Sequence, residues 1–222
     1  MVKFMINIFY CDVSPLSDDI LFKLSAEKIS NNKKEKIDRL KVRKDKNLSL
    51  AGELILKYAF ENLGYDYSQI IFSKKETGKP FLENLNLKFS ISHSDTFSAV
   101  AVSEDEVGID IEKIKDYNPA IAKKIFTENE FKKICSYENG TERKNIFFRI
   151  WTLKEAYVKM TGKSIFDFKS FEIIPDKVYL CSNIVSGCSF REFETDGYKM
   201  SVSFMDEDAK ISLKKVSLLD II

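Results

Sequence analysis

Two carboxylates alternate with branched apolar residues in the segment VGIDIE, residues 107–112. In a strand, Asp110 and Glu112 would project from the same face, about 6–7 Å apart along the chain, with the branched residues facing the other way. Such a pair suits magnesium, which takes oxygen ligands from one or two carboxylates and fills its other positions with phosphate oxygens. An amphipathic edge strand with a solvated face is the structural alternative, and this segment alone leaves both interpretations open.

A second group of chemically useful side chains lies in the segment WTLKEAYVKMTGKS, residues 151–164. Trp151, Glu155 and Lys159 are four residues apart, so a helix would carry them on one stripe. A surface ion pair between Glu155 and Lys159 is the structural alternative. The chain's single Trp on the same stripe indicates contact with something buried. Glu155 would then be a third carboxylate of a metal site, and Lys159 a phosphate clamp.

The only histidine, His93, follows a strand-like run and is flanked by Ser92, Ser94 and Asp95. Short polar residues therefore crowd the end of a strand, where free backbone donors can hold a phosphate. A lone histidine with a structural role is the alternative. Ser-His-Asp in direct sequence does not indicate a catalytic triad, because triad members converge from separate elements.

Residues 33–46 hold eight Lys or Arg against three acids. A solvated helix face is one interpretation, and nucleic-acid binding is another. The stretch has little aromatic interleaving for base stacking, however, which argues against nucleic acid. A small polyanionic ligand fits better, because a local patch suffices for a few phosphates. Lys79, on the turn TGKP, would be a further cation of the same kind.

The composition limits the class of protein. Among 222 residues, 35 Lys and Arg against 34 Asp and Glu give a formal net charge of +1, which disfavours a general grip on nucleic acid or membrane. Hydrophobic residues make up 44%, including 18 Phe, enough for a folded core. No apolar stretch approaches the roughly 20 residues of a membrane span, and the first residues resemble a strand rather than a signal peptide. We expect a cytoplasmic protein with reduced thiols, because its cysteines are scattered without a CxxC pair: Cys11, Cys135, Cys181 and Cys188.

Helices and strands must bring these side chains together. Helices are expected from about residue 18, over 47–63 with Gly64 as C-cap, and over 143–160 ending at Gly162. Capping signals at Asn118 and Thr127 mark two further helix starts. Strands are expected at 4–10, 70–72, 87–92, 97–103, 107–112, 171–174, 178–180, 199–204 and 211–216. Helices followed by strands thus occur twice, in halves that pack as one unit, and the predicted class is α+β.

Three carboxylates, several separated lysines and one histidine are the components of metal-assisted chemistry on a phosphate-rich ligand. Over about residues 30–165, the chain resembles the Sfp-type 4′-phosphopantetheinyl transferases. The motifs that carry the resemblance are TGKP (77–80), FSISHSD (89–95), VGIDIE (107–112), FTENEF (126–131) and WTLKEAYVKMTGKS (151–164). The resemblance implies a pseudo-twofold monomer of two similar α/β halves, residues 1–112 and 113–222, with coenzyme A between them.

The implied reaction moves the 4′-phosphopantetheine arm of coenzyme A to a serine of an apo acyl or peptidyl carrier protein, releasing adenosine 3′,5′-bisphosphate. In this resemblance Asp110 and Glu112 match the metal-binding acidic pair. Glu155 matches a glutamate that is either a third magnesium ligand or the base that takes the serine proton, and Lys159 matches a phosphate-binding lysine. These four are the expected catalytic residues.

Further residues match contacts of the family with coenzyme A. They are Ser92 and His93 on the phosphates, Lys79 near the pyrophosphate, and Lys33, Lys36 and Ser49 on the 3′-phosphate. Glu130 matches an acid sometimes implicated in catalysis. Many members have Gly-Lys-Gly after the long helix, whereas Ser164 stands here at the second glycine. If that position needs a positive φ, serine would strain it by about 1 kcal/mol.

Carrier proteins of this family are acidic helical bundles, so docking is expected on a basic or apolar patch near the cleft. Residues 114–126, with Tyr117, Ile121 and Ile125 exposed or half-buried, are the candidate. A coenzyme A-binding protein without transferase activity is the alternative function, although such a protein has no evident need for three clustered carboxylates. Nucleic-acid binding through residues 33–46 is a further alternative.

Overall fold

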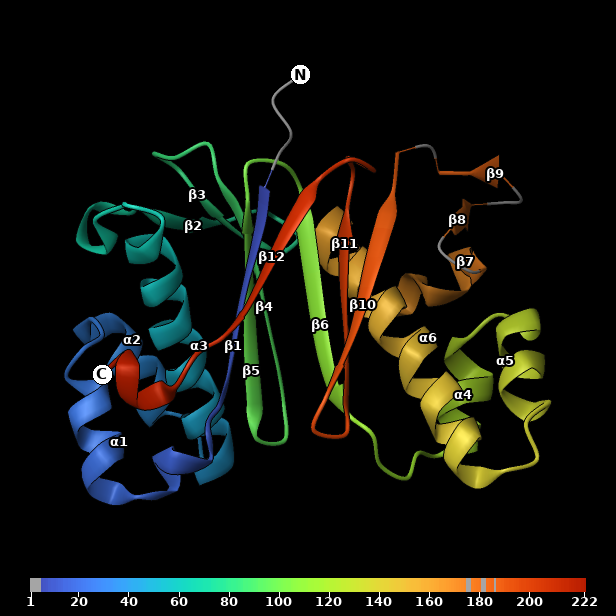
Figure 1. Ribbon diagram of the computed structural model, residues 1–222, viewed down its shortest axis with the longest axis horizontal. Coiled ribbons are helices and arrows are strands. Elements are labelled where there is room, and N and C mark those ends of the chain that lie inside the picture. The colour runs from blue at the N-terminus through green and yellow to red at the C-terminus, as the bar shows by residue number, and fades with distance from the viewer. Residues whose placement is uncertain (1–4, 175–176, 181–182, 186) are drawn as a thin grey trace.

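The structure is a computed structural model that describes residues 5–174, 177–180, 183–185 and 187–222 (Figure 1). Its helices are α1 (Asp19–Ala26), α2 (Asn31–Asp38), α3 (Arg43–Asn62), α4 (Pro119–Ile125), α5 (Glu128–Cys135) and α6 (Gly140–Thr161). Its strands are β1 (Met5–Asp12), β2 (Phe72–Lys74), β3 (Pro80–Leu82), β4 (Lys88–Ser94), β5 (Phe97–Ser103), β6 (Val107–Lys113), β7 (Phe171–Ile174), β8 (Lys177–Leu180), β9 (Asn183–Ile184), β10 (Ser189–Thr195), β11 (Tyr198–Phe204) and β12 (Lys210–Lys215). Short 3-10 turns lie at Ser14–Ser17, Tyr67–Gln69, Ile165–Ser170 and Leu218–Asp220.

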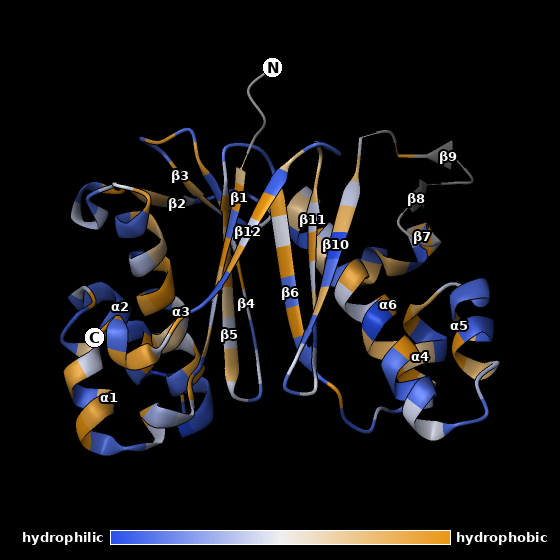
Figure 2. Ribbon diagram, viewed as in Figure 1, coloured by the Kyte–Doolittle hydropathy of each residue, from blue (hydrophilic) through white to orange (hydrophobic). Residues whose placement is uncertain are grey.

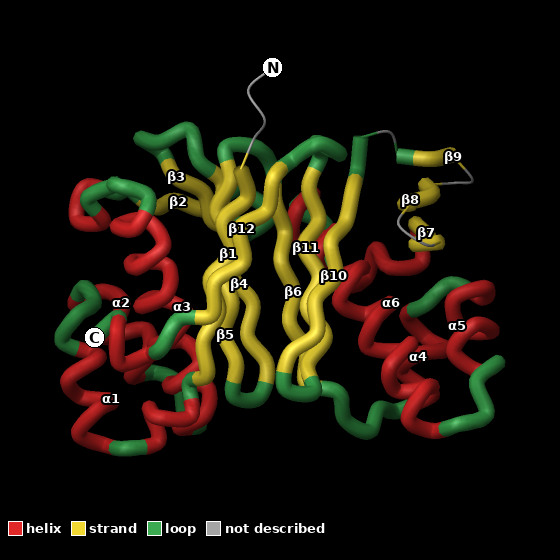
Figure 3. Tube along the Cα trace, in the orientation of Figure 1, coloured by secondary structure: helices red, strands yellow, loops and turns green. Residues whose placement is uncertain are grey.

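The strands form central sheets with helices on both outer sides (Figure 1, Figure 3). Sheet A has the order β12-β1-β5-β4, and sheet B has the order β10-β11-β6. Helices α1, α2 and α3 lie beside sheet A, whereas α4, α5 and α6 lie beside sheet B. The expected α+β class, with similar helix-and-sheet halves, is therefore confirmed.

The sheets divide the chain differently from the expected halves 1–112 and 113–222. All but the last residue of strand β6 belongs to the first expected half, yet the strand pairs with β11 in sheet B. Strand β12, near the C-terminus, pairs in parallel with β1 in sheet A. The C-terminal part thus supplies a strand to the N-terminal sheet, which ties the halves together. Pairing between strands so far apart in sequence leaves no signal in the local residue pattern.

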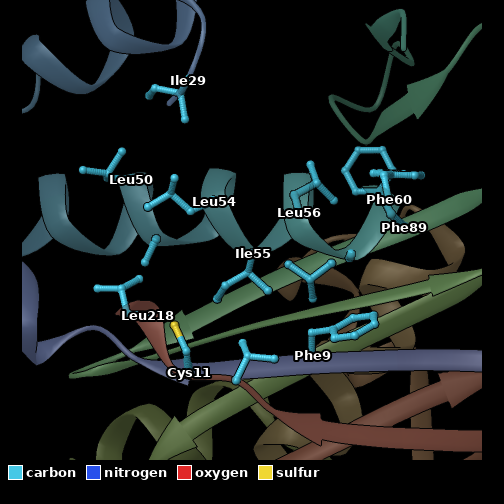
Figure 4. Packing of buried hydrophobic residues seen from close by; sticks show 14 of the residues in the cluster. Phe9, Cys11, Ile29, Leu50, Leu54, Ile55, Leu56, Phe60, Phe89 and Leu218 are labelled. Atoms are coloured by element: carbon cyan, nitrogen blue, oxygen red, sulfur yellow. The ribbon is translucent and has the colours of Figure 1, made fainter. Parts of the chain in front are cut away.

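The core has three parts. Between α3 and sheet A, helix residues such as Leu54 and Phe60 pack on Phe9 and Phe89 (Figure 4). A second cluster fills the space between the sheets, where the branched residues of β6 lie. A third packs α6 against α4, α5 and β7. Figure 2 accordingly shows apolar colouring along the central strands β5 and β6. None of the described helices has the length and apolarity of a membrane-crossing segment.

Most of the expected elements are present, with three informative differences. Strand β10 was not predicted, because its sequence SFREFET mixes charged residues with only two phenylalanines. Helix α3 begins at Arg43 rather than at residue 47, so part of the basic stretch is helical. Ser164 has a φ of −126° and caps the following 3-10 turn by accepting a hydrogen bond from the Phe166 amide. Ser164 is therefore not strained, because the residue that adopts the left-handed conformation is Gly162, whose φ is 74°.

Candidate active site

Sheets A and B meet where β4 lies beside β6, and a row of serine hydroxyls joins them. The serines alternate along β4, so their side chains share one face. Each hydroxyl oxygen accepts a hydrogen bond from a backbone amide of β6: Ser90 from Ile109 (3.1 Å), Ser92 from Ile111 (3.3 Å) and Ser94 from Lys113 (3.2 Å). This seam carries the acidic residues of β6.

Asp110 is the most buried acid of the seam, with 3% of its surface exposed. Its Oδ1 accepts hydrogen bonds from Ser92 Oγ at 2.7 Å and from Lys159 Nζ at 2.7 Å. Its Oδ2 is buried and has no hydrogen-bond partner among the described residues. A buried carboxylate oxygen without a partner is energetically costly, so this atom marks a place where a cation or a donor would be favourable.

Glu112 and Glu155 lie close enough to Asp110 to feel its charge. Burial, and next the negative charge of Asp110, raise the pKa of Glu112, whose Oε2 accepts a hydrogen bond from Ser94 Oγ at 2.5 Å. The same two causes raise the pKa of Glu155 to about 7. The raised pKa values of Glu112 and Glu155 show that burial and the negative charge of Asp110 together outweigh the nearby Lys159 ammonium.

The stripe predicted on α6 faces this cluster. Lys159 does not form the simple surface pair with Glu155, because its ammonium bonds Asp110 and Ser92 Oγ, the latter at 2.9 Å. Within the described part of the chain, the structure gives Glu155 no hydrogen bond and no ion pair. Trp151 is half-buried against Phe126 and Phe147, as its place on the stripe predicted.

Gly108 explains how α6 reaches the acidic strand. A Cβ atom at this position would lie 2.0 Å from the carbonyl oxygen of Ala156 and 2.5 Å from the amide nitrogen of Met160. The backbone of α6 therefore packs directly on β6, which is possible only without a side chain. Ala156 and Met160 immediately follow Glu155 and Lys159, so this contact sets the position of both functional side chains.

The donor set fits a hard divalent cation. Asp110, Glu112 and Glu155 offer oxygen ligands only, and Asp110 Oδ2 is unpartnered. Among the described residues, no three His, Cys, Asp or Glu side chains already stand close enough to hold a metal ion. Binding by all three would therefore require side-chain movements.

A cleft of about 230 Å³ opens beside this cluster, and Lys79, Lys159 and Lys163 are among its lining residues. A larger cleft of about 590 Å³ continues toward α2 and α3. The two clefts share wall residues on β3 and β4, so they form one groove: Pro80, Phe89 and Ile91. The larger cleft is lined by Lys33, Lys36 and Ser49, the three residues matched to 3′-phosphate contacts.

Two further expected cations are already paired, as Lys159 is with Asp110. Lys33 Nζ lies 2.6 Å from Glu53 Oε1. Lys79 Nζ lies 2.5 Å from Glu106 Oε2 and donates to the Met160 carbonyl at 2.5 Å, close to the end of α6. Lys36 is exposed to solvent. A phosphate bound in the groove would compete with Glu53 and Glu106 for the paired lysines.

Other members of the basic stretch have structural partners. Arg43 pairs with Asp19, Lys44 pairs with Asp95, and Lys46 donates to the Asp38 carbonyl. The two ion pairs reduce the charge that the stretch can offer to a long polyanion, which disfavours the nucleic-acid alternative.

Ser92 and His93 differ in availability. Ser92 is buried, and its single proton is donated to Asp110, so the hydroxyl has no proton left for a phosphate. His93 has an exposed edge, although the surrounding protein and the Lys159 ammonium lower the pKa of its ring.

Glu130 lies in a buried ion pair. Both of its carboxylate oxygens accept hydrogen bonds from Lys154 Nζ, at 2.7 and 2.8 Å, and both side chains are almost fully buried. The remaining contacts come from the amides of Ile173 (3.0 Å) and Thr127 (3.0 Å), the latter completing the predicted capping box. This carboxylate is therefore committed to joining α5, α6 and β7, and a catalytic role for it is not supported.

Several contacts of the site were not predicted from the sequence. Ser94 binds Glu112, Glu106 binds Lys79, and Glu53 binds Lys33. The period-two serines of residues 90–94 were a visible signal for the first. The two glutamates gave none, because each meets its lysine only after folding brings separate elements together.

A partly buried acidic cluster beside a lysine-lined groove is typical of a site that acts on a phosphate-rich substrate. Residues 106–203 match the family model described as the 4′-phosphopantetheinyl transferase superfamily. Residues 14–105 match the model described as 4′-phosphopantetheinyl transferase, N-terminal. The chain therefore belongs to the 4′-phosphopantetheinyl transferase family.

Individual members of the family are similar in sequence to this chain over most of its length. It is 36% identical over 163 residues to 4′-phosphopantetheinyl transferase gsp of Aneurinibacillus migulanus, covering 73% of this chain and 68% of that protein. It is 30% identical over 204 residues to 4′-phosphopantetheinyl transferase Sfp of Bacillus subtilis (strain 168), covering 85% and 88%. The resemblance and the transferase class are confirmed, and transfer of phosphopantetheine from coenzyme A is favoured over a non-catalytic binding role.

Proposed function

We propose that this transferase is magnesium-dependent and that its reaction centre is the cluster of Asp110, Glu112, Glu155 and Lys159 at the β4–β6 seam. The observation that carries the proposal is the unpartnered, buried Oδ2 of Asp110 beside two carboxylates with raised pKa values. The three carboxylates would hold the ion. Bound magnesium would offset the negative charge of the pyrophosphate and stabilise the leaving phosphate.

The chain's own residues supply the remaining chemistry. Lys159 places an ammonium beside Asp110, where it stabilises charge on the transferred phosphate. Glu155, with a pKa of about 7, is suited either to accept the serine proton near neutral pH or to serve as a third ligand. Positioned general bases contribute about 10²–10⁴-fold to rates.

Glu155→Gln separates these two roles. If Glu155 is the base, the variant should retain its magnesium affinity while its transfer rate falls about 10²-fold or more. If Glu155 is a magnesium ligand, the magnesium affinity of the variant should fall together with its transfer rate. Release of adenosine 3′,5′-bisphosphate gives the rate, and calorimetric titration gives the affinity. Unchanged rate and unchanged affinity would contradict the proposal.

Coenzyme A would lie along the groove. Its 3′-phosphate would contact Lys36 and Ser49, with Lys33 released from Glu53, and its pyrophosphate would lie near Lys79 and Lys159. His93 remains a candidate phosphate contact. Distant contacts of this kind supply binding energy that can be used at the reacting phosphorus.

The acceptor would be the serine of an apo acyl or peptidyl carrier protein, docked on residues 114–126. In this segment Ile121 is 49% exposed, and Lys123 and Lys124 are exposed beside it. A partly apolar, basic surface suits an acidic helical partner.

We further propose that the enzyme is a cytoplasmic monomer. Its described thiols support a reducing compartment, because Cys11, Cys135 and Cys188 are all unpaired.

A further inference from the structure

The serine row of β4 carries a second pattern besides its contacts with the β6 amides. A serine hydroxyl has one proton to donate and lone pairs to accept. In Ser92 and Ser94, the lone pairs take the amide hydrogen bonds, and the proton goes to a carboxylate. Ser94 Oγ donates to Glu112 Oε2 at 2.5 Å, as Ser92 Oγ does to Asp110 Oδ1.

Ser90 completes the comparison, because it stands beside Gly108 and has no carboxylate to bind. Its hydroxyl accepts from the Ile109 amide at 3.1 Å, as its two neighbours accept from theirs. Joining the strands therefore requires only the acceptor function of each serine. Donation to a carboxylate is additional, and it occurs only opposite the acids.

Donation through a single proton leaves each acid with one oxygen held and one oxygen available. The structure shows this directly for Asp110, whose Oδ1 is held and whose Oδ2 has no partner among the described residues. Glu112 has one more rotatable side-chain bond than Asp110. A hydrogen bond to its carboxylate therefore restricts its orientation more than the same bond restricts that of Asp110. Its Oε2 is fixed by Ser94, a residue with 8% of its surface exposed.

We propose that Ser94 is a positioning residue of the transferase: by holding Glu112 Oε2, it orients the other carboxylate oxygen toward the magnesium ion. Ser92 does the same for Asp110, in place of binding a phosphate through its hydroxyl. The inference rests on the proposed magnesium site. Partners that orient metal-binding carboxylates typically contribute about 10- to 100-fold to metal affinity.

The test is calorimetric titration of magnesium into the full-length protein with coenzyme A present. Ser94→Ala should weaken the magnesium Kd about 10- to 100-fold. Ser90→Ala, which loses the same kind of amide contact and no carboxylate contact, should change it by less than about twofold. Ser94→Thr should restore the affinity, because threonine keeps the hydroxyl. Circular dichroism establishes that each variant is folded.

Ser94→Val provides a second comparison if Ser94→Ala does not fold. Valine and threonine have nearly the same shape, so the Thr–Val difference isolates the hydroxyl. Equal magnesium affinities in Ser94→Ala and Ser90→Ala, or in the Thr and Val variants, would overturn the inference while leaving the magnesium site intact. Asp110→Ala serves as reference: wild-type protein that binds magnesium no better than this variant would overturn the proposed function itself, and the inference with it.

Discussion

The ionised form of Glu155 is unfavourable in the folded protein, because its carboxylate is largely buried and lies near Asp110. Its pKa of about 7 in the fold exceeds the unfolded value of 4.5, so the folded state binds the proton more tightly. Stability contributed by this group is present at low pH and is lost as the pH rises through 7. Ionisation of Glu155 therefore lowers the stability of the metal-free protein as the pH rises.

Glu155→Gln should consequently stabilise the metal-free protein at pH 8, by about 1–2 kcal/mol once partial solvent screening is allowed for. At pH 4.5 the gain should largely vanish, because wild-type Glu155 is then protonated in the fold. Urea unfolding in the presence of a chelator, at both pH values, measures the difference. A gain of the same size at both pH values would show that the effect does not come from ionisation.

At the scale of elements, β6 and α6 form the site by direct backbone contact at Gly108. Gly108→Ala should separate them, because the added methyl group would meet α6 backbone atoms at 2.0 and 2.5 Å. We expect a loss of about 1–3 kcal/mol or more in unfolding free energy. Transfer activity should fall further than stability explains, because Glu155 and Lys159 move with the helix.

Gly140→Ala is the matched control for this substitution. Gly140 begins α6, and a Cβ there would meet nothing within 4 Å. This variant should be neutral or slightly stabilising, since alanine favours a helix more than glycine does. The midpoints of unfolding in guanidinium or urea, measured for both variants, give the comparison. Equal midpoints would mean that the close approach at Gly108 is not required.

The sequence predicted local features of the site and missed its long-range ones. Alternation in VGIDIE predicted that Asp110 and Glu112 share a face, and helical spacing predicted that Trp151, Glu155 and Lys159 do. These are consequences of the backbone repeat alone. The serine–carboxylate bonds and the lysine–glutamate pairs join elements distant in sequence, so they depend on packing. The pairing of β12 with β1 in sheet A could not be predicted from the sequence for the same reason.

At the scale of the whole molecule, the groove begins at α2 and α3 and ends at the β4–β6 seam, so one ligand would touch both halves. Lys36→Ala, at the far end, should weaken coenzyme A binding about tenfold and leave dephospho-coenzyme A binding unchanged. The loss is selective because only coenzyme A carries the 3′-phosphate. Lys34→Ala, on the same helix and outside the cleft lining, is the control. Equal losses for both ligands would place the 3′-phosphate elsewhere.

The carrier surface that we propose, residues 114–126, lies on the opposite side of the molecule from α1 (Figure 1). Reversing the charges of Lys123 and Lys124 to glutamate should raise the KM for an apo carrier protein without changing the KM for coenzyme A, because we expect an acidic carrier. Lys23→Glu on α1 should leave both constants unchanged. A cognate carrier that reacts equally well with the doubly reversed variant would exclude residues 114–126 as its docking site.

Intact-protein mass spectrometry tests the central claim most directly. An apo acyl carrier protein and an apo peptidyl carrier protein are each incubated with the enzyme, coenzyme A and magnesium, with and without a chelator. We expect the wild-type enzyme to add one phosphopantetheine mass to at least one carrier, and the gain to disappear on chelation or in folded Asp110→Ala. A gain that persists in Asp110→Ala, or in the presence of the chelator, would contradict a magnesium-dependent reaction centre at the β4–β6 seam.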